Sequence, residues 1–315
     1  MSKPIAEVVF NIPLERSFHY LIPEELQGSL QRGMRVVAPF GPRERVGFVT
    51  ERLDESPVRE LKPIRQVLDP RPVIADERWA LAEWLSRYYY CSLGEALCAM
   101  VPNGLRLPKD SAARLPGAAA GSRAPEMTNS HSLPPFKTRQ LSVHQRRAFK
   151  IILEALGAPT SQTILLHGVT GSGKTELYLR AIEQVLRQGR SAIYLVPEIA
   201  LTPQAIDRLH ERFAATVGVW HSRVTNKARR EAWTRIVDGT CRVVIGARSA
   251  IFSPARRLGL VILDEEHEST YKQGEVPRFH AREVACARAR LTGATVLLGS
   301  ATPSIESSYA ATRRG

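Results

Sequence analysis

The feature that most constrains this chain is the octapeptide at 168–175, Gly-Val-Thr-Gly-Ser-Gly-Lys-Thr. The apolar stretch 163–167 before it predicts a strand, and the stretch 174–189 after it has the apolar spacing of a helix. In this strand–loop–helix context, G-x-x-x-x-G-K-T is typical of a phosphate-binding loop. A glycine-rich turn without a ligand is the alternative, and the two flanking elements argue against it.

Each residue type in this loop has a physical reason. Glycines let backbone N–H groups converge on phosphate oxygens, because no Cβ blocks the approach, and the following helix adds the positive end of its dipole. Lys174 can reach the β and γ phosphates, and Thr175 can ligate Mg²⁺. The loop residues that we expect to bind the nucleotide are Gly168, Gly171, Ser172, Gly173, Lys174 and Thr175.

A second acidic motif, Asp264-Glu265-Glu266-His267, follows the apolar stretch 258–263. An aspartate at the carboxyl end of a buried strand can hold the Mg²⁺ that the phosphate loop presents, and Glu265 can orient or deprotonate the attacking water. An acidic cluster alone is usually a solvated turn. Downstream of a phosphate loop, it indicates the catalytic carboxylates Asp264 and Glu265.

Two weaker signals accompany these motifs. The amide of Gln145 has a donor and an acceptor and could bind adenine, although a lone glutamine on a helix is more often a surface residue. Ser300 and Thr302, in the stretch 299–304, follow an apolar strand and could couple the nucleotide to a neighbouring site. By itself, that stretch is an ordinary turn.

The chain divides into three stretches of different character. Residues 1–105 predict a β-rich domain with a hairpin around Gly41-Pro42 and a helix over 76–90 capped by Asp76. Residues 106–138 are rich in Ala, Pro, Gly and Ser and read as a flexible linker. From 139 to 315, strands and helices alternate, which predicts an α/β fold with a parallel sheet and helices on both faces.

Charge indicates a polyanionic partner. The formal net charge is +13, and the excess lies in two blocks: residues 101–150 hold 9 Lys and Arg against 2 Asp and Glu, and residues 201–250 hold 9 against 4. Residues 1–100 are nearly balanced, at 13 against 14. A solvated basic surface explains the charge equally well when it is taken alone.

Composition excludes several other classes. The apolar runs are far shorter than the roughly 20 residues of a membrane span, and the first residues show no secretory signal. The four cysteines, at 91, 98, 241 and 286, form no C-x-x-C pair, so neither a zinc site nor a disulfide framework is expected in this chain. A reducing, cytoplasmic location fits this cysteine usage best.

Together these motifs resemble superfamily 2 helicases, and more narrowly the bacterial replication-restart helicases of the PriA (primosomal protein N′) family. The resemblance covers nearly the whole chain except the linker. It is carried by GVTGSGKT, LVPEIALTPQ, GARSAIFSP, DEEHESTYKQGEVPRFHAREVA and GSATPS, and in the amino-terminal block by PLERSFHYLIP, GMRVVAPFGPRERVGFV, LKPIRQVLD and WLSRYYYCSLGEAL.

The resemblance implies a RecA-like helicase lobe that uses ATP and Mg²⁺, with Gln145 as the adenine-reading residue. It also implies an aromatic-rich loop over 268–280 that senses single-stranded DNA, in which aromatic faces stack on bases and cations hold phosphates. Packing in the core is the alternative role for Phe279. The residues assigned to this DNA contact are Arg248, Tyr271, Lys272, Arg278, Phe279 and His280.

In the same way, the amino-terminal domain resembles the family's domain for the 3′ end of a nascent strand. The site residues there are Phe18, His19 and Tyr20, where the family pattern has an aspartate between the two aromatic residues. A neutral domain agrees better with recognition of an end in a pocket than with a phosphate-tracking groove. Because an imidazole does not accept hydrogen bonds as a carboxylate does, contact of His19 with a 3′-hydroxyl is in question.

The parent protein implied by this resemblance is an ATP-dependent 3′→5′ DNA helicase that recognises stalled or branched forks and starts primosome assembly. Its partners would be forked DNA with a 3′ end, single-stranded DNA, and primosome and single-stranded-DNA-binding proteins, with no membrane partner. The family's winged-helix domain, second motor lobe and zinc domain have no counterpart in this chain, so we expect a nearly inactive fragment, with zinc only in the missing carboxyl-terminal part. The alternatives are a non-catalytic fork-binding fragment and another superfamily 2 translocase of the RecG type.

Overall fold

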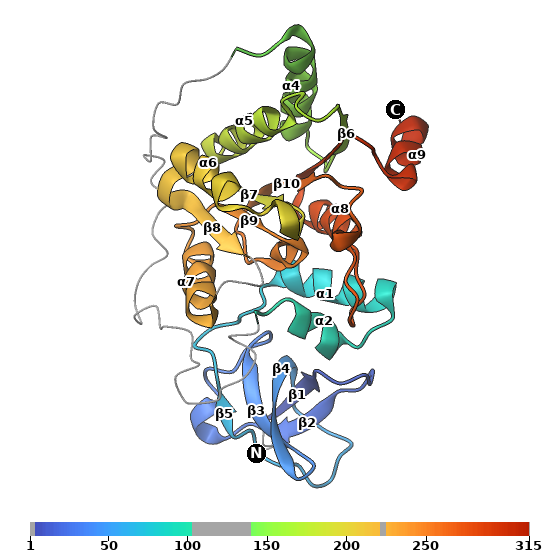
Figure 1. Ribbon diagram of the computed structural model, residues 1–315. Helices are drawn as coiled ribbons and strands as arrows, with labels where there is room; N and C mark the ends of the chain where they lie inside the picture. Colours follow the sequence, from blue (N-terminus) through green and yellow to red (C-terminus); the bar gives the residue numbers. More distant parts are fainter. Residues whose placement is uncertain (1–3, 103–139, 221–224, 315) are drawn as a thin grey trace. The chain divides into compact units, whose positions relative to one another are not determined.

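The computed structural model describes residues 4–102, 140–220 and 225–314. The predicted linker 106–138 lies outside the described residues. The chain forms two compact units, one built mainly from residues before 103 and one mainly from residues after 139 (Figure 1).

The amino-terminal unit contains a five-stranded antiparallel sheet with the strand order β2-β1-β4-β3-β5. The hairpin predicted around Gly41-Pro42 is confirmed, because Phe40 pairs with Arg43 across the turn. The strands are β1 (Ile5–Phe10), β2 (Phe18–Leu21), β3 (Arg35–Phe40), β4 (Arg43–Leu53) and β5 (Gln66–Val67).

Alternation along the strands explains the core of this unit. Successive side chains of a strand point to opposite faces, so Ala6, Val8 and Phe10 of β1 are all buried in one cluster. A buried ion pair also stabilises the unit. Arg35 Nη2 donates to Asp69 Oδ1 at 2.6 Å, and the two side chains are only 1% and 0% exposed.

Two helices follow the sheet, α1 (Asp76–Tyr89) and α2 (Leu93–Ala99). The prediction of α1 is confirmed, but the prediction that Asp76 caps it is wrong. The N-cap residue is Ala75, which makes no side-chain cap, and Asp76 lies in the first turn, where its charge favours the helix dipole. The sequence analysis missed α2, although Ser92 and Glu95 form a capping box that marks its start.

The second unit contains a six-stranded parallel sheet with the order β6-β11-β10-β7-β9-β8, and the predicted α/β fold is confirmed. The strands are β6 (Thr163–His167), β7 (Ser191–Leu195), β8 (Val217–Trp220), β9 (Val243–Gly246), β10 (Leu258–Asp264) and β11 (Thr295–Ser300). The helices are α4 (Val143–Leu156), α5 (Lys174–Arg187), α6 (Pro203–Phe213), α7 (Asn226–Val237), α8 (Ala281–Thr292) and α9 (Ile305–Arg314).

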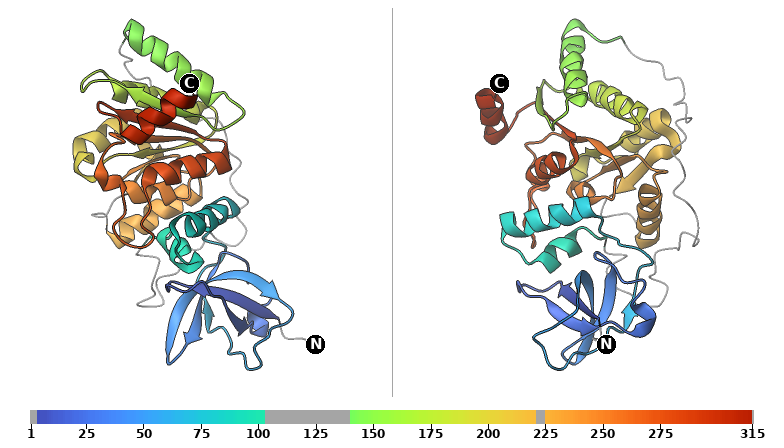
Figure 2. Two further views of the ribbon diagram at one scale, coloured as in Figure 1. Left: turned by 90° about the vertical axis from the view of Figure 1, so that its right-hand side faces the viewer. Right: turned by 180° about the vertical axis from the view of Figure 1, so that it is seen from behind.

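Helices cover both faces of this sheet (Figure 2). Leu260 and Ile262 of β10 belong to the core cluster that includes the apolar side of α5. The alternate residues Val261 and Leu263 are equally buried, and α8 packs against β10 as well. A strand buried on both faces reads as a continuous apolar run, which is why the sequence identified β10 without a period of two.

Helix α8 begins at Ala281, because the His280 side chain caps it by accepting a hydrogen bond from the Arg282 backbone N–H. The sequence did not predict helix α9. Within the described ranges, no helix is long and apolar enough to cross a membrane.

Candidate nucleotide and DNA site

The strand order of the second unit explains how three motifs meet. The phosphate loop follows β6, the stretch 299–304 begins at the end of β11, and the acidic motif begins at the end of β10. These strands are neighbours in a parallel sheet, so their carboxyl ends lie on one edge. Ligands of open α/β sheets bind at this edge, where the chain reverses its strand order.

The phosphate loop is held in shape by its own residues. Gly173 has φ +86°, a conformation that side-chain-bearing residues avoid, and it leads directly into α5. The Lys174 ammonium group donates to the Gly168 carbonyl at 2.7 Å and lies 3.9 Å from Glu265 Oε1. The structure therefore brings the predicted lysine and one predicted carboxylate into one site.

Asp264 is held by two tyrosines that the sequence analysis did not single out. The Tyr178 hydroxyl donates to Asp264 Oδ1 at 3.0 Å, and the Tyr194 hydroxyl donates to Oδ2 at 3.2 Å. Burial raises the pKa of Asp264, and the hydrogen bonds from the two tyrosines act in the opposite direction. Burial also raises the pKa of Tyr178 and Tyr194, so both stay protonated donors.

Tyr178 reaches Asp264 only because residue 299 is a glycine. A Cβ on Gly299 would lie 1.6 Å from the Tyr178 hydroxyl oxygen, far inside any allowed contact. Gly299 is therefore needed for Tyr178 to hold Asp264 in place. The sequence showed no sign of this contact between Gly299 and Tyr178, because the two residues are far apart along the chain.

The predicted coupling residues Ser300 and Thr302 do contact the acidic motif. His267 Nδ1 lies 2.7 Å from Ser300 Oγ, and its Nε2 lies 3.4 Å from Thr302 Oγ1. His267 Nδ1 is also 3.7 Å from Glu265 Oε2. One imidazole thus connects the candidate water-activating carboxylate to the segment after β11.

Gln145 lies beside the phosphate loop. Its amide oxygen accepts from the Ser142 backbone N–H in a capping box, and its amide nitrogen donates to the Ser172 carbonyl at 2.8 Å. Both polar atoms are engaged within the protein. Adenine recognition by Gln145 stays a prediction, and it would require these two hydrogen bonds to be exchanged.

The loop 268–280 presents cations and buries its rings. Tyr271 is 1% exposed and donates its hydroxyl to the carbonyls of Leu195 and Asp264, while Phe279 is 4% exposed. Lys272 and Arg278 are exposed, and the Lys272 ammonium donates to the Arg278 carbonyl. In this conformation, neither ring can stack on a base.

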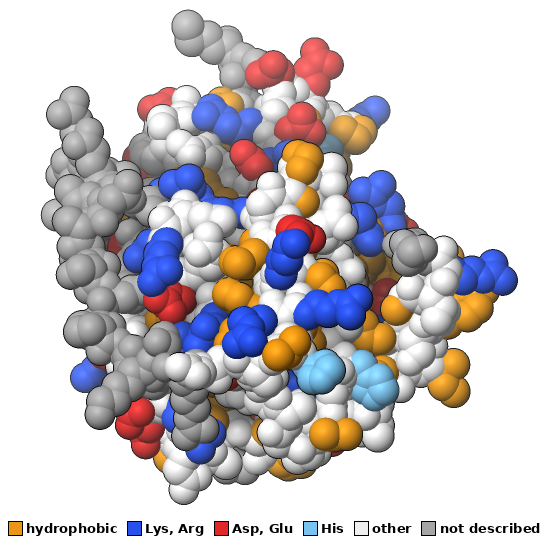
Figure 3. Space-filling model, turned by 90° about the horizontal axis from the view of Figure 1, so that it is seen from above, with side chains coloured by type: hydrophobic (Ala, Val, Ile, Leu, Met, Phe, Trp, Pro, Cys, Tyr) orange, Lys and Arg blue, Asp and Glu red, His pale blue; other side chains and the backbone are white. Residues whose placement is uncertain are grey.

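The basic block 201–250 has partly internal roles. Arg212 is 2% exposed and pairs with Glu176 and Glu183 on α5. Arg248 donates to the carbonyls of Thr270 and Lys272, which anchors the start of the loop. On the face in Figure 3, Lys and Arg side chains lie scattered among apolar and other side chains. The block 101–150 falls mostly outside the described residues.

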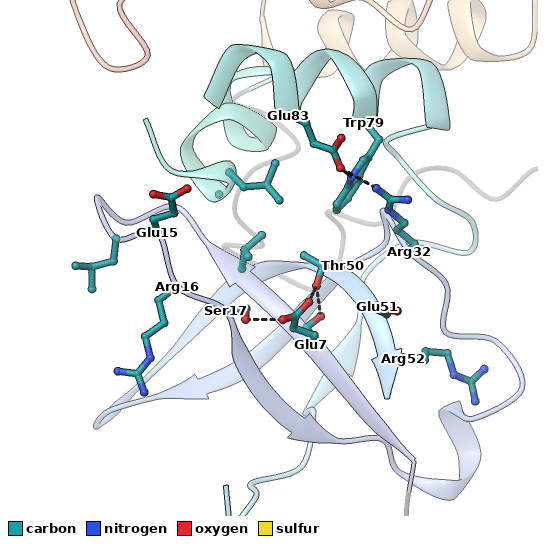
Figure 4. Close-up of a pocket in the computed structure, with 14 residues that line it drawn as sticks. Glu7, Glu15, Arg16, Ser17, Arg32, Thr50, Glu51, Arg52, Trp79 and Glu83 are labelled. Carbon is teal, nitrogen blue, oxygen red and sulfur yellow. Dashed lines mark hydrogen bonds and ion pairs between the residues drawn. The ribbon is translucent and has the colours of Figure 1, made fainter. Parts of the chain in front are cut away.

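The amino-terminal unit has a pocket of about 720 Å³ (Figure 4). Glu7 lies in it and accepts hydrogen bonds from the hydroxyls of Ser17 and Thr50, both at 2.5 Å. The other charged residues that line it are three arginines and three glutamates, namely Arg16, Arg32, Arg52, Glu15, Glu51 and Glu83. A pocket with both carboxylates and guanidinium groups suits a ligand with a hydrogen-bond donor and an anionic group.

The predicted trio 18–20 divides between two environments. Tyr20 is buried and donates its hydroxyl to the Pro39 carbonyl, and Phe18 packs edge-on against Phe10. His19 is the cross-strand partner of Glu7, with His19 Nε2 4.0 Å from Glu7 Oε1. The sequence lacks a carboxylate at position 19, but the sheet register supplies one next to it.

Among the described residues, no group of three or more His, Cys, Asp and Glu could hold a metal ion. The four cysteines, all of them in the part of the chain that the structure describes, form no disulfide. Mg²⁺ prefers oxygen donors, and Asp264 and the exposed Thr175 at the start of α5 carry side-chain oxygens.

Comparison with known families assigns both units. Residues 7–102 match the model of the PriA 3′DNA-binding domain, and residues 142–310 match the DEAD/DEAH box helicase model. The chain belongs to the DEAD/DEAH box helicase family. Members of this family use ATP and Mg²⁺, and the second match covers more than half of the chain.

Relatives agree over both units. The replication restart protein PriA of Treponema pallidum is 43% identical over 98% of this chain and 46% of its own length. PriA of Bacillus subtilis is 32% identical over 98% of this chain and 54% of its own. The chain spans about half the length of these curated relatives, and the resemblance to PriA helicases is confirmed. Among solved structures, RecG bound to a three-way DNA junction is 26% identical over 55% of this chain and 22% of that chain, with a TM-score of 0.43.

Proposed function

We propose that the chain is the nucleotide-binding and DNA-end-binding part of an ATP-dependent 3′→5′ DNA helicase that acts at stalled or branched replication forks. The observation that carries this proposal is one sheet edge with Lys174, Asp264 and Glu265, in a chain whose other unit matches a 3′DNA-binding domain. Because the chain spans about half of its relatives, the activity of the whole protein is part of the proposal.

Mg²⁺ and ATP fit the residues that are present. Asp264 offers carboxylate oxygens that two tyrosines hold in place, and Thr175 offers a hydroxyl at the start of α5. Bound Mg·ATP supplies the phosphoanhydride bond whose hydrolysis drives the motor. Lys174 leaves the Gly168 carbonyl to neutralise phosphate charge, and Glu265 orients a water and accepts its proton at Oε.

Single-stranded DNA is the ligand that we assign to the loop 268–280. The exposed Lys272 and Arg278 provide its phosphate contacts. Stacking by Tyr271, Phe279 and the half-buried His280 stays a prediction. It requires the buried rings of Tyr271 and Phe279 to leave their present packing.

A 3′ end is the ligand that we assign to the amino-terminal pocket. Such an end carries a free hydroxyl, from which Glu7 can accept a hydrogen bond. One of the arginines that line the pocket, Arg16, Arg32 or Arg52, then holds the adjoining phosphate. Glu7 then has the role that His19 cannot fill. The predicted residues Phe18 and Tyr20 of β2 pack in or against the core cluster, and this packing positions β2 beside β1, which carries Glu7.

The relatives are named replication restart proteins, and this name supports a role in restarting replication. We assign forked DNA as the substrate, and primosome and single-stranded-DNA-binding proteins as partners, from the resemblance to the PriA helicases. We place the chain in the cytoplasm, because its four cysteines form no disulfide, as is usual in a reducing compartment.

The nucleotide half of the proposal is tested by the binding of a fluorescent ATP analogue with Mg²⁺ to the 315-residue chain. Lys174→Ala removes charge-assisted hydrogen bonds to phosphate, so we expect about 10- to 100-fold weaker binding. Lys150→Ala, at an exposed i,i+4 pair on α4, is the control and should bind normally. Equal binding by Lys174→Ala would favour the non-catalytic fork-binding alternative. Steady-state ATP turnover with and without forked DNA extends the same comparison.

The DNA half is tested with forks that end in a 3′-hydroxyl or a 3′-phosphate. The wild-type chain should prefer the hydroxyl, and Glu7→Gln should reduce that preference by up to about tenfold, because a charge-assisted hydrogen bond is replaced by a weaker neutral one. Glu44→Gln, an exposed glutamate of β4 outside the pocket, should keep the preference. A chain that binds both ends equally before any substitution lacks 3′-end recognition, which leaves the RecG-like alternative.

A further inference from the structure

The acidic motif has a third carboxylate, Glu266, that the proposed mechanism does not use. Glu265 has φ +46°, and this turn after β10 directs consecutive side chains to different surroundings. Glu265 lies beside Lys174 in the nucleotide site, whereas the Glu266 side chain is fully buried. The Glu266 backbone N–H donates to the Gly299 carbonyl, which fixes the turn against β11.

The Glu266 carboxylate is surrounded by donors. It accepts from the Ser304 backbone N–H at 2.7 Å, the Ser307 hydroxyl at 2.8 Å and the Ser304 hydroxyl at 3.1 Å. It also accepts from Arg282 Nη1 at 3.1 Å. A carboxylate has lone pairs for all four bonds, and an uncharged amide in its place would turn an N–H₂ group toward some of these donors.

These donors come from segments that flank the functional loops. Arg282 lies in the first turn of α8, two residues after the loop 268–280 ends at His280. Ser304 is the last residue of GSATPS, and Ser307 lies in the first turn of α9. Arg282 Nη1 also donates to the hydroxyls of Ser304 and Ser307, so the three segments share one network.

We propose that Glu266 is a positioning residue that couples the DNA-facing loop to the nucleotide site. Movement of the loop on DNA shifts Arg282, Arg282 moves Glu266, and Glu266 is adjacent to the water-activating Glu265. The same carboxylate carries the shift to the end of GSATPS and to the first turn of α9. This inference rests on the proposed function, since it needs both ligands, and it concerns a link separate from the His267–Ser300 contact.

The test measures the affinity of a fluorescent ATP analogue with Mg²⁺, with and without a 20-nucleotide oligo(dT), for the 315-residue chain. The ratio of the two affinities is the coupling factor. For the wild type we expect a factor above about 5. For Glu266→Gln we expect a factor near 1, with the affinities for each ligand alone within about twofold of wild type, because Glu266 contacts neither ligand.

Glu283→Gln is the matched control, because Glu283 Oε1 accepts from Nε of the same arginine at 3.2 Å on the exposed side. It should keep the wild-type coupling factor. A folded Glu266→Gln chain that also keeps it would overturn the proposal.

A second variant covers the case in which Glu266→Gln does not fold. Ser307→Ala removes one donor and leaves the ion pair intact, and we expect it to lower the coupling factor about twofold. An unchanged factor in Ser307→Ala then rejects the proposal. A wild-type chain that binds both ligands with a factor of 1 also rejects it, while the proposed function survives. A wild-type chain that binds neither ligand rejects the proposed function itself.

Discussion

Each unit pairs an arginine with a fully buried carboxylate, and the two pairs have different surroundings. Arg35 and Asp69 form a two-point pair, with Nε–Oδ2 at 2.8 Å and Nη2–Oδ1 at 2.6 Å, and neither residue lines the pocket of its unit. Arg282 donates one hydrogen bond to Glu266, and Glu266 accepts three more from Ser304 and Ser307. Glu266 is also next to Glu265 of the candidate nucleotide site.

The difference teaches how to interpret buried charge. The Arg35–Asp69 pair joins β3 to the segment after β5, and neither residue lines the pocket of its unit, so its loss should affect stability alone. The Glu266 network joins segments to which we assign two different ligands, so its loss should affect communication between the two proposed sites. Burial by itself does not distinguish the two cases, whereas the identity of the connected segments does.

We expect the largest effect from a substitution that breaks the Arg35–Asp69 pair. Asp69→Ala leaves Arg35 charged and buried without its partner, which typically costs about 3–5 kcal/mol. Denaturant unfolding should show this loss, and nucleotide affinity of the folded variant should stay at the wild-type value. The control is Glu44→Ala, whose pair with Arg65 is about 58% exposed and should be worth about 0–1 kcal/mol. A loss below 1 kcal/mol for Asp69→Ala would contradict the structural role.

We expect a smaller effect, on ligand binding and not on stability, from a substitution beside Asp264 in the candidate nucleotide site. Tyr178→Phe removes one hydrogen bond from Asp264 and leaves those from Tyr194 and the Glu265 backbone. We expect about fivefold weaker Mg²⁺-dependent nucleotide binding, since a net hydrogen bond is worth about 1 kcal/mol. Titration of Mg²⁺ against a fluorescent nucleotide measures it, with Tyr309→Phe on α9 as the control. An unchanged midpoint for Tyr178→Phe would mean that Tyr194 alone positions Asp264.

The smallest expected effect is a pH dependence of stability. Burial alone would raise the pKa of Glu266, but hydrogen bonds from Ser304, Ser307 and Arg282 outweigh burial, and the pKa is lowered. The folded chain then binds this proton less readily than the unfolded chain, so Glu266 contributes stability above the ordinary glutamate pKa. That contribution is lost as the pH falls through the lowered value. Unfolding from about pH 6 to about pH 3 should therefore show a steeper loss for the wild type than for Glu266→Gln. Parallel curves would argue against an ionised Glu266.

Local signals made much of the second unit predictable. The phosphate loop is eight consecutive residues between a strand and a helix, so its geometry is encoded locally. The strand ends that carry Asp264 and Ser300 could be read in the same way. By contrast, Tyr178 and Tyr194 contact Asp264 through the sheet order, which no local pattern reveals.

The residues of the amino-terminal pocket were harder to predict from the sequence, because they also come together through strand pairing. The sequence showed a histidine where a carboxylate was expected, and only the β1–β2 register brings Glu7 opposite His19. The buried state of Tyr271 and Phe279 was also beyond sequence reasoning, because an aromatic loop has the same composition whether its rings face DNA or the core.

The fit between Gly299 and Tyr178 has a consequence for how such chains diverge. Any side chain at 299 would occupy the space of the tyrosine hydroxyl, so an exchange at one position is tolerated only after a smaller residue arises at the other. The two positions therefore constrain each other as a pair. In an alignment of related helicases they should vary together, and a lone alanine at 299 beside a retained tyrosine should mark a motor with a displaced Asp264.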